Sequence, residues 1–324
     1  MSNWQPRRSP VALGGLMAAL AAVFGMMSQL LPFFFDVLAP LPLALAAILL
    51  SRSVAVAAAV AASLLLGMLT GPLAGLGFFL RTAIVGVVCG WLVQARRRYA
   101  VIFCGTTLAQ VIGSSLWLAV MVVLMGVPLP SVSAMEENLF ASAERMNLYA
   151  TLAESGMDAT QAEAMFVNAV HTVVRLTPAI YVLFFACLSG VVLFLLHLLC
   201  RRLRTPVQVP APRWKAILMP PAVLVPVLFA WVALLLERHF ANPLLWIFAA
   251  NVMVIGAAGM VLDGLSYILD RLKFSEKPPV TQCLFILLAL LMGWYLIAAC
   301  AIIGVFDSIA DYRHLRSQKG EESQ

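Results

Sequence analysis

Long apolar runs are the feature that most constrains the fold of this chain. About nine runs of roughly membrane-spanning length follow one another, separated by short polar segments. The chain is 63% hydrophobic and 11% charged, whereas soluble domains carry about 25% charged residues. We therefore predict an all-α, polytopic membrane protein with about nine transmembrane helices, or eight if one run does not cross. The predicted spans are 10–31, 37–50, 54–69, 72–93, 101–127, 178–200, 217–236, 243–269 and 281–305.

Basic residues concentrate beside these runs and predict their orientation. With the N-terminus in the cytoplasm, the predicted inner segments hold fourteen Lys and Arg, and the outer loops hold Arg145, Arg175 and Arg238. Nine spans would leave the C-terminal tail outside, so one span can be re-entrant or miscounted. The net charge of +6 is thus explained by topology and does not indicate nucleic-acid binding.

Residues 128–174 form the one long polar interval, and this insert is predicted to be extracytoplasmic. Capping boxes at Ser133 and Thr160 and a stop at Gly156 predict two amphipathic helices on the bundle or at the membrane surface. One basic residue, Arg145, accompanies the acidic ones. The acidic residues are Glu136, Glu137, Glu144, Glu154, Asp158 and Glu163.

The spans group into two predicted parts. A six-helix membrane module with the insert would cover 1–204, and a three-helix membrane extension would cover 216–305. A basic, Pro-rich cytoplasmic linker, 205–215, would join them, and a polar tail, 306–324, would close the chain.

The sequence contains few candidate catalytic residues. The chain has no GxxxxGK phosphate-binding loop and no HExxH metal motif, and its four histidines are scattered. We expect no catalytic residues, no metal, no cofactor and no ATPase of its own.

Small residues in the first half predict close helix packing. Gly14, Ala18 and Ala22 recur at four-residue spacing, as do Gly86 and Gly90. Such rows let helix backbones approach closely in lipid. They pack either within the bundle or against a membrane partner, and the sequence leaves both alternatives open.

Arg81 is the charged residue predicted to lie deepest in the membrane. It falls about ten residues into its span, near mid-membrane at about 1.5 Å per residue. An ionised group there costs about 3 kcal/mol or more unless it is paired or hydrated. Asp36, Gln110 and Ser114 are the predicted partners, in either a structural ion pair or a ligand-binding cavity.

Four stretches, in this order, resemble the YybS-like family of uncharacterised bacterial membrane proteins. They are 40–43 leading to Arg52, the Gly-rich run ending at Arg96–Arg98, 176–179 opening a run that ends at Arg201–Arg202, and 304–307 with 311–313. The first six helices of that family are similar to the substrate-binding components of energy-coupling-factor vitamin transporters. The resemblance implies that Gly14, Ala18 and Ala22 dock on a membrane coupling subunit.

Two functions are compatible with these features. The first is small-molecule binding or transport in the bacterial inner membrane, with an ATPase module or coupling subunit supplied by a partner. The second is a non-transporting membrane scaffold or regulator that acts through a partner. Only the first requires a polar cavity within the bundle.

Overall fold

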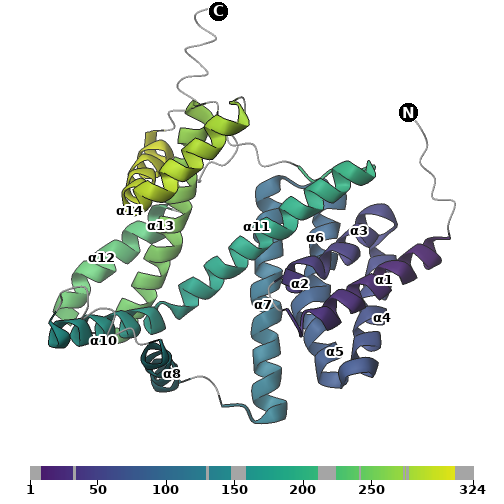
Figure 1. Ribbon diagram of the computed structural model, residues 1–324, viewed down its shortest axis with the longest axis horizontal. Helices are drawn as coiled ribbons and strands as arrows, with labels where there is room; N and C mark the ends of the chain where they lie inside the picture. Colours follow the sequence, from purple (N-terminus) through teal and green to yellow (C-terminus); the bar gives the residue numbers. More distant parts are fainter. Residues whose placement is uncertain are drawn as a thin grey trace, which may run out of the picture. The chain divides into compact units, whose positions relative to one another are not determined.

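The computed structural model describes residues 9–31, 34–128, 131–146, 158–210, 224–240, 242–272, 274 and 277–310. Within these residues every regular element is a helix (Figure 1). The chain divides into two compact units. Unit 1 comprises Met1–Leu129 and Phe184–Ala211, and unit 2 comprises Pro130–Leu183 and Pro212–Gln324.

Seven helices in the described residues are long and apolar enough to cross a membrane. Two of the nine predicted spans are not among them. The run at 37–50 forms two short helices, α2 (Phe34–Leu38) and α3 (Pro40–Leu49). The described part of the run at 217–236 is Leu224–Leu236 of α12 (Leu224–Phe240), and 217–223 lie outside the described residues. The all-helical membrane fold is therefore confirmed, whereas the count of nine stays a prediction. The seven are Pro10–Met27, Arg52–Thr70, Pro72–Gln94, Tyr99–Met125, Thr177–Leu203, Leu244–Arg271 and Leu291–Ile309.

Proline and small polar residues set where several helices begin. Helix α1 (Pro10–Met27) starts with proline after the N-cap Ser9, whose hydroxyl accepts a hydrogen bond from the Ala12 amide. Helix α4 (Arg52–Thr70) is capped in the same way by Ser51. Gly71 ends α4 and leads into α5 (Pro72–Phe78). Its φ of 113° is a backbone conformation that favours glycine.

Helix α3 forms the centre of unit 1, because every residue from Pro40 to Ile48 is buried. It packs against α6 (Ile84–Gln94), where Gly86 and Gly90 face its backbone. A Cβ on Gly86 would lie 2.5 Å from the Pro40 carbonyl oxygen, and a Cβ on Gly90 would lie 2.5 Å from that of Ala44. Larger side chains at these two positions would push the helices apart.

Unit 1 is completed by α7 (Tyr99–Met125) and by the second part of α11 (Thr177–Leu203), which begins in unit 2. One buried cluster joins α3, α6, α7 and α11 through Ile48, Val93, Ile102 and Cys200. The ends of these helices are therefore held together around a common core.

Unit 2 contains α8 (Val132–Arg145), α10 (Ala159–Arg175), α12, α13 (Pro243–Arg271) and α14 (Pro279–Ala310), which is kinked at Gly293. Helices α13 and α14 cross with their backbones in contact. A Cβ on Gly264 would collide with the Cys300 carbonyl oxygen, and one on Gly304 with that of Met260. Gly264 and Gly304 therefore allow close backbone contact between two helices of unit 2, as Gly86 and Gly90 do in unit 1.

The predicted insert contains two described helices, α8 and α10, but their caps differ from the predicted ones. Ser131, two residues before the predicted Ser133, accepts a hydrogen bond from the Ala134 amide. Helix α10 begins after Asp158. Glu136 contacts His171 instead of closing a capping box, with 2.6 Å between Oε1 and Nδ1. The predicted stop at Gly156 lies outside the described residues.

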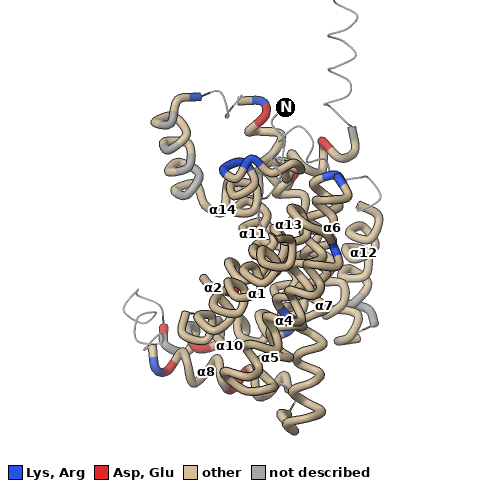
Figure 2. Tube along the Cα trace, turned by 90° about the vertical axis from the view of Figure 1, so that its right-hand side faces the viewer, with Lys and Arg blue, Asp and Glu red and all other residues tan. Residues whose placement is uncertain are grey.

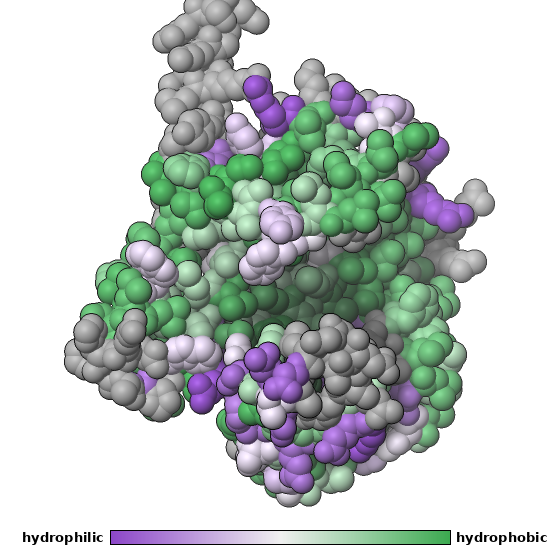
Figure 3. Space-filling view, turned by 60° about the vertical axis from the view of Figure 1, so that its left-hand side comes forward, coloured by the Kyte–Doolittle hydropathy of each residue, from purple (hydrophilic) through white to green (hydrophobic). Residues whose placement is uncertain are grey.

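The surface is largely apolar. Figure 3 shows broad hydrophobic areas on the face in view, and Figure 2 shows most Lys and Arg residues at helix ends. Side chains such as Leu64, Phe194 and Phe229 are exposed along candidate spans and other apolar helices. A lipid environment accounts for these residues. The predicted domain boundaries stay a prediction, and parts of the 205–215 linker and the tail lie outside the described residues.

Candidate functional site

Arg81 lies on a π-helical turn, η1 (Phe79–Ala83), between α5 and α6. The predicted span 72–93 is therefore not a uniform α-helix. A π turn adds one residue to the helical repeat, and such turns are frequent at functional sites.

A close approach of α7 holds the π turn in place. A Cβ on Gly113 would collide with the Leu80 carbonyl oxygen, so the backbones of α7 and η1 are in direct contact. Gln110 and Ser114 flank Gly113 on α7, at helical spacings that put them beside the turn. The glycine contact thus brings both side chains to the Arg81 site.

Asp36 reaches Arg81 from the other side. Asp36 lies on α2, which directly precedes α3, the helix that packs on Gly86 and Gly90 of α6. The distance from Arg81 Nη2 to Asp36 Oδ2 is 3.7 Å. The two side chains are 47% and 26% exposed, so the pair is reachable by solvent or a ligand.

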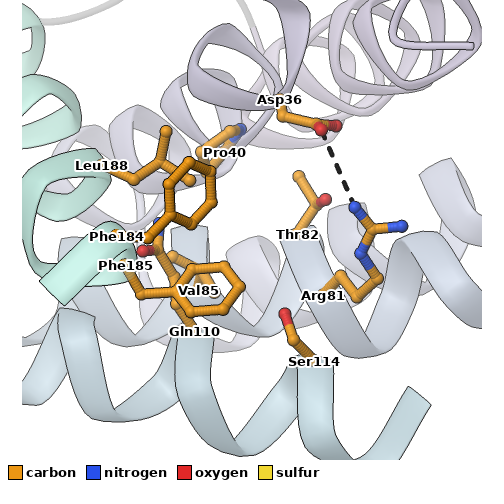
Figure 4. Close-up of a pocket in the computed structure, with 10 residues that line it drawn as sticks. All are labelled: Asp36, Pro40, Arg81, Thr82, Val85, Gln110, Ser114, Phe184, Phe185 and Leu188. Carbon is orange, nitrogen blue, oxygen red and sulfur yellow. Dashed lines mark ion pairs between the residues drawn. The ribbon is translucent and has the colours of Figure 1, made fainter. Parts of the chain in front are cut away.

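A cavity of about 100 Å³ lies next to this pair (Figure 4). It brings together all four residues predicted to bind a ligand: Asp36, Arg81, Gln110 and Ser114. Phe184 and Phe185 of α11 form the side away from Arg81. The remaining lining residues are Pro40, Thr82, Val85 and Leu188.

A second cavity, of about 130 Å³, shares Asp36, Arg81 and Thr82 with the first. Its other polar residues include Ser28 and Gln29, which follow α1. The Arg81–Asp36 pair therefore borders two small cavities of unit 1, each lined by apolar residues and a few polar side chains.

The polar groups of the site differ in how fully they are bonded. Gln110 is 3% exposed, and its Oε1 accepts a hydrogen bond of 3.1 Å from the hydroxyl of buried Ser189. Within the described residues Arg81 makes the Asp36 ion pair and no hydrogen bond. The guanidinium carries five N–H donors, so it has donors to offer a bound anion.

Sequence reasoning missed Thr82, Phe184, Phe185 and Gly113. Phe184 and Phe185 follow the start of α11 and looked like ordinary residues of an apolar run. Gly113 carried a usable signal, since it is a glycine inside a span, between Gln110 and Ser114. The π turn itself has no recognisable sequence pattern.

The predicted packing residues are all buried inside unit 1. Gly14 faces Val54 of α4, and a Cβ there would lie 2.8 Å from Val54 Cγ1. Ala18 and Ala22 are 2% and 6% exposed and belong to a core cluster with α4 alanines. This face of α1 therefore packs within the bundle, and its docking on a partner stays a prediction.

Comparison with known proteins identifies the family. The family described as predicted membrane protein (DUF2232) matches residues 16–308. The chain belongs to the DUF2232 family. No curated protein and no solved structure matches it. The DUF2232 match runs from within α1 through most of α14, so it includes the whole Arg81 site. Among the described residues of this DUF2232 chain, no group of three or more His, Cys, Asp or Glu could hold a metal ion.

Proposed function

We propose that this membrane protein binds a small anionic molecule at Arg81, and that it acts by binding or transport without an ATPase or catalytic step of its own. The observation that carries the proposal is the loose Arg81–Asp36 pair. Its 3.7 Å separation exceeds the roughly 2.7–2.9 Å of a charge-assisted hydrogen bond. An anionic ligand can therefore form closer contacts with the guanidinium than Asp36 does.

The size of the cavity restricts the ligand. Sites for drug-sized molecules enclose about 300–1,000 Å³, and this cavity encloses about 100 Å³. It fits a small anion, or the carboxylate or phosphate end of a larger molecule. Ser114 and Thr82 supply neutral hydrogen-bonding groups, and Phe184 and Phe185 supply an apolar wall.

The cost of burying charge supports the same conclusion. An unpaired arginine in the middle of a transmembrane helix costs about 2.5–3.5 kcal/mol on insertion scales. Asp36 offsets part of this cost, and a bound anion or water would offset more. The polar side chains in these two cavities also favour binding over the alternative of a non-transporting scaffold, which needs no such cavity.

Mass spectrometry of the purified protein tests the proposal. The full chain, purified from membranes in mild detergent, should retain a small anionic molecule that is released on denaturation. The Arg81→Gln variant should lose it, whereas Arg145→Gln, which removes an arginine from α8, should keep it. Recovery of no anion from the wild type, or equal recovery from Arg81→Gln, would contradict the proposal.

We also propose a bacterial inner-membrane location, a cytoplasmic N-terminus and a partner that supplies energy coupling. The resemblance to energy-coupling-factor binding components supports these statements. A cysteine introduced at Ser142, which is exposed on α8, should react with a membrane-impermeant thiol reagent in whole cells with a permeabilised outer membrane. Reaction only after lysis would reverse the orientation.

Affinity purification from native membranes should recover an ATPase module.

A further inference from the structure

One end of unit 1 collects seven exposed arginines. They come from three helix ends: the buried cluster around Val93 and Cys200 holds the ends of α6 and α11 together, and a hydrogen bond from Arg52 to Gln94 links the start of α4 to α6. Arg52 starts α4, a group of three follows α6, and another group closes α11. The arginines are Arg52, Arg96, Arg97, Arg98, Arg201, Arg202 and Arg204.

Unit 1 offers this surface no acidic partner. Asp36 is the one Asp or Glu in 1–129 and 184–211. It lies before α3, whose ten residues separate it from Arg52 by about 15 Å at the α-helical rise. The arginine surface of unit 1 therefore carries uncompensated positive charge.

The side chain of Arg52 is held in position by two contacts. Arg52 Nε donates a 3.3 Å hydrogen bond to Gln94 Oε1, and its guanidinium lies 5.2 Å from the centre of the Trp91 ring. Cation–π stacking of this kind favours arginine over lysine, because the guanidinium is planar.

The arginines at the end of α11 are also presented by an ordered turn. Arg204 has φ 49°, and the chain then folds back along the helix. Gln208 Nε2 donates to the carbonyl oxygens of Cys200 and Thr205, at 3.2 and 2.9 Å. His197 Nδ1 lies 2.9 Å from the Val209 carbonyl oxygen. This turn is part of the fold and not a loose basic tail.

Exposed apolar side chains accompany the arginines on the same helices. Trp91, Val101, Leu198 and Leu203 are 42%, 48%, 44% and 49% exposed. Each lies within about two turns of one of the arginine groups. The surface therefore combines phosphate-binding groups with an apolar border.

We propose that this end of unit 1 is a binding surface for anionic phospholipids. Guanidinium groups bind phosphate oxygens in bidentate fashion, and the apolar border would contact the acyl chains of the same lipid. Charges that only set orientation during insertion need neither the stacked Arg52 nor the ordered turn after α11. A free phosphate would use the arginines but not the border. The proposal is independent of the Arg81 site.

Lipid titration of the purified full chain tests this surface. In detergent, phosphatidylglycerol should raise Tm by about 2–4 °C relative to phosphatidylcholine with the same acyl chains. High salt should reduce the shift, because salt screens exposed charges. Glycerol 3-phosphate, the headgroup phosphate without chains, should give a much smaller shift. No difference between the two lipids, or an equal shift with glycerol 3-phosphate, would overturn the proposal.

Two variants distinguish lipid binding at a defined surface from an effect of overall net charge on the Tm shift. Arg52→Lys keeps the charge that orients the chain but loses the planar stack on Trp91, so the lipid-induced shift should fall several-fold. Arg145→Gln removes one charge from α8 and should leave the shift unchanged. An unchanged shift in Arg52→Lys, or an equal loss in Arg145→Gln, would show that phosphatidylglycerol acts through overall charge. Capture of an acidic protein that competes with phosphatidylglycerol would assign the surface to that protein.

Discussion

The Arg81 site of unit 1 and the Asn251 site of unit 2 are both polar sites in apolar surroundings, but they use their hydrogen-bonding groups differently. Asn251 Nδ2 donates to the carbonyl oxygens of Arg175 and Ile247, at 2.9 and 2.7 Å. Its Oδ1 accepts from the Ala179 amide at 2.7 Å. Both halves of the amide are therefore bonded within the protein. Arg81 has one ion-pair partner at 3.7 Å.

The difference separates a structural polar group from one available to a ligand. Asn251 joins α13 to the junction of α10 and α11, where Arg175 also stacks on Trp246 at 5.4 Å. That junction depends on side-chain hydrogen bonds. The Arg81 site is instead positioned by backbone packing at Gly86, Gly90 and Gly113. The Arg81 side chain is therefore not needed to hold the helices together.

Gly90→Val should have the largest effect on stability, because the Arg81 site depends on the close approach of the α3 and α6 backbones. The added side chain would meet the Ala44 carbonyl oxygen and force α3 from α6, lowering the free energy of unfolding by about 3 kcal/mol. Thermal unfolding in detergent measures the effect. Gly15→Val is the matched control, since a Cβ on Gly15 meets nothing within 4 Å. Equal losses in both variants would mean that helix propensity, and not packing, limits stability.

Asn251→Ala should have the second-largest effect on the free energy of unfolding. It leaves the Ala179 amide and the Arg175 carbonyl without their side-chain partner, a cost of about 2 kcal/mol of unfolding free energy. The same thermal unfolding measurement applies. Asn138→Ala is the control, because Asn138 is exposed and its side-chain amide donates to the Ala134 carbonyl oxygen of its own helix. A loss no greater than that of the control would remove the structural role assigned to Asn251.

Arg81→Gln should cost less than about 1 kcal/mol of stability, because a half-exposed pair at 3.7 Å contributes little. It should nonetheless abolish retention of the anionic ligand. Stability and ligand content are measured on one preparation. A loss of stability as large as that of Asn251→Ala would make Arg81 a structural group and end the contrast between the two sites.

His171→Gln should have the smallest effect, about 0.5 kcal/mol or less. The His171–Glu136 contact is short at 2.6 Å, but the His171 side chain is 41% exposed on the insert. Chemical unfolding of the purified protein would measure it. An effect greater than that of Arg81→Gln would show that contact distance outweighs exposure in this protein.

The helices were predictable because an apolar run needs no tertiary information to be recognised. The short helices were harder. Residues 37–49 are apolar throughout, yet the break between α2 and α3 depends on local geometry at Pro40. The helix caps show the same limit, since Ser131 and Ser133 are both plausible cap residues two positions apart.

The Arg81 site was partly predictable for a physical reason. An arginine deep in a span requires polar neighbours, and that requirement pointed to Asp36, Gln110 and Ser114. Phe184 and Phe185 could not be found in this way, because an aromatic residue in an apolar run has no such requirement. Their part in the cavity follows only from how α11 packs in unit 1.

The burial of α3 removes a constraint that lipid places on other transmembrane helices. A helix in contact with acyl chains must match a hydrocarbon layer of about 30 Å or deform it. The ten residues of α3 extend about 15 Å, half that thickness, but its neighbours are protein. Hydrophobic mismatch therefore does not act on it. We expect this freedom to let α2 sit below the membrane interface, which brings the carboxylate of Asp36 to the depth of Arg81.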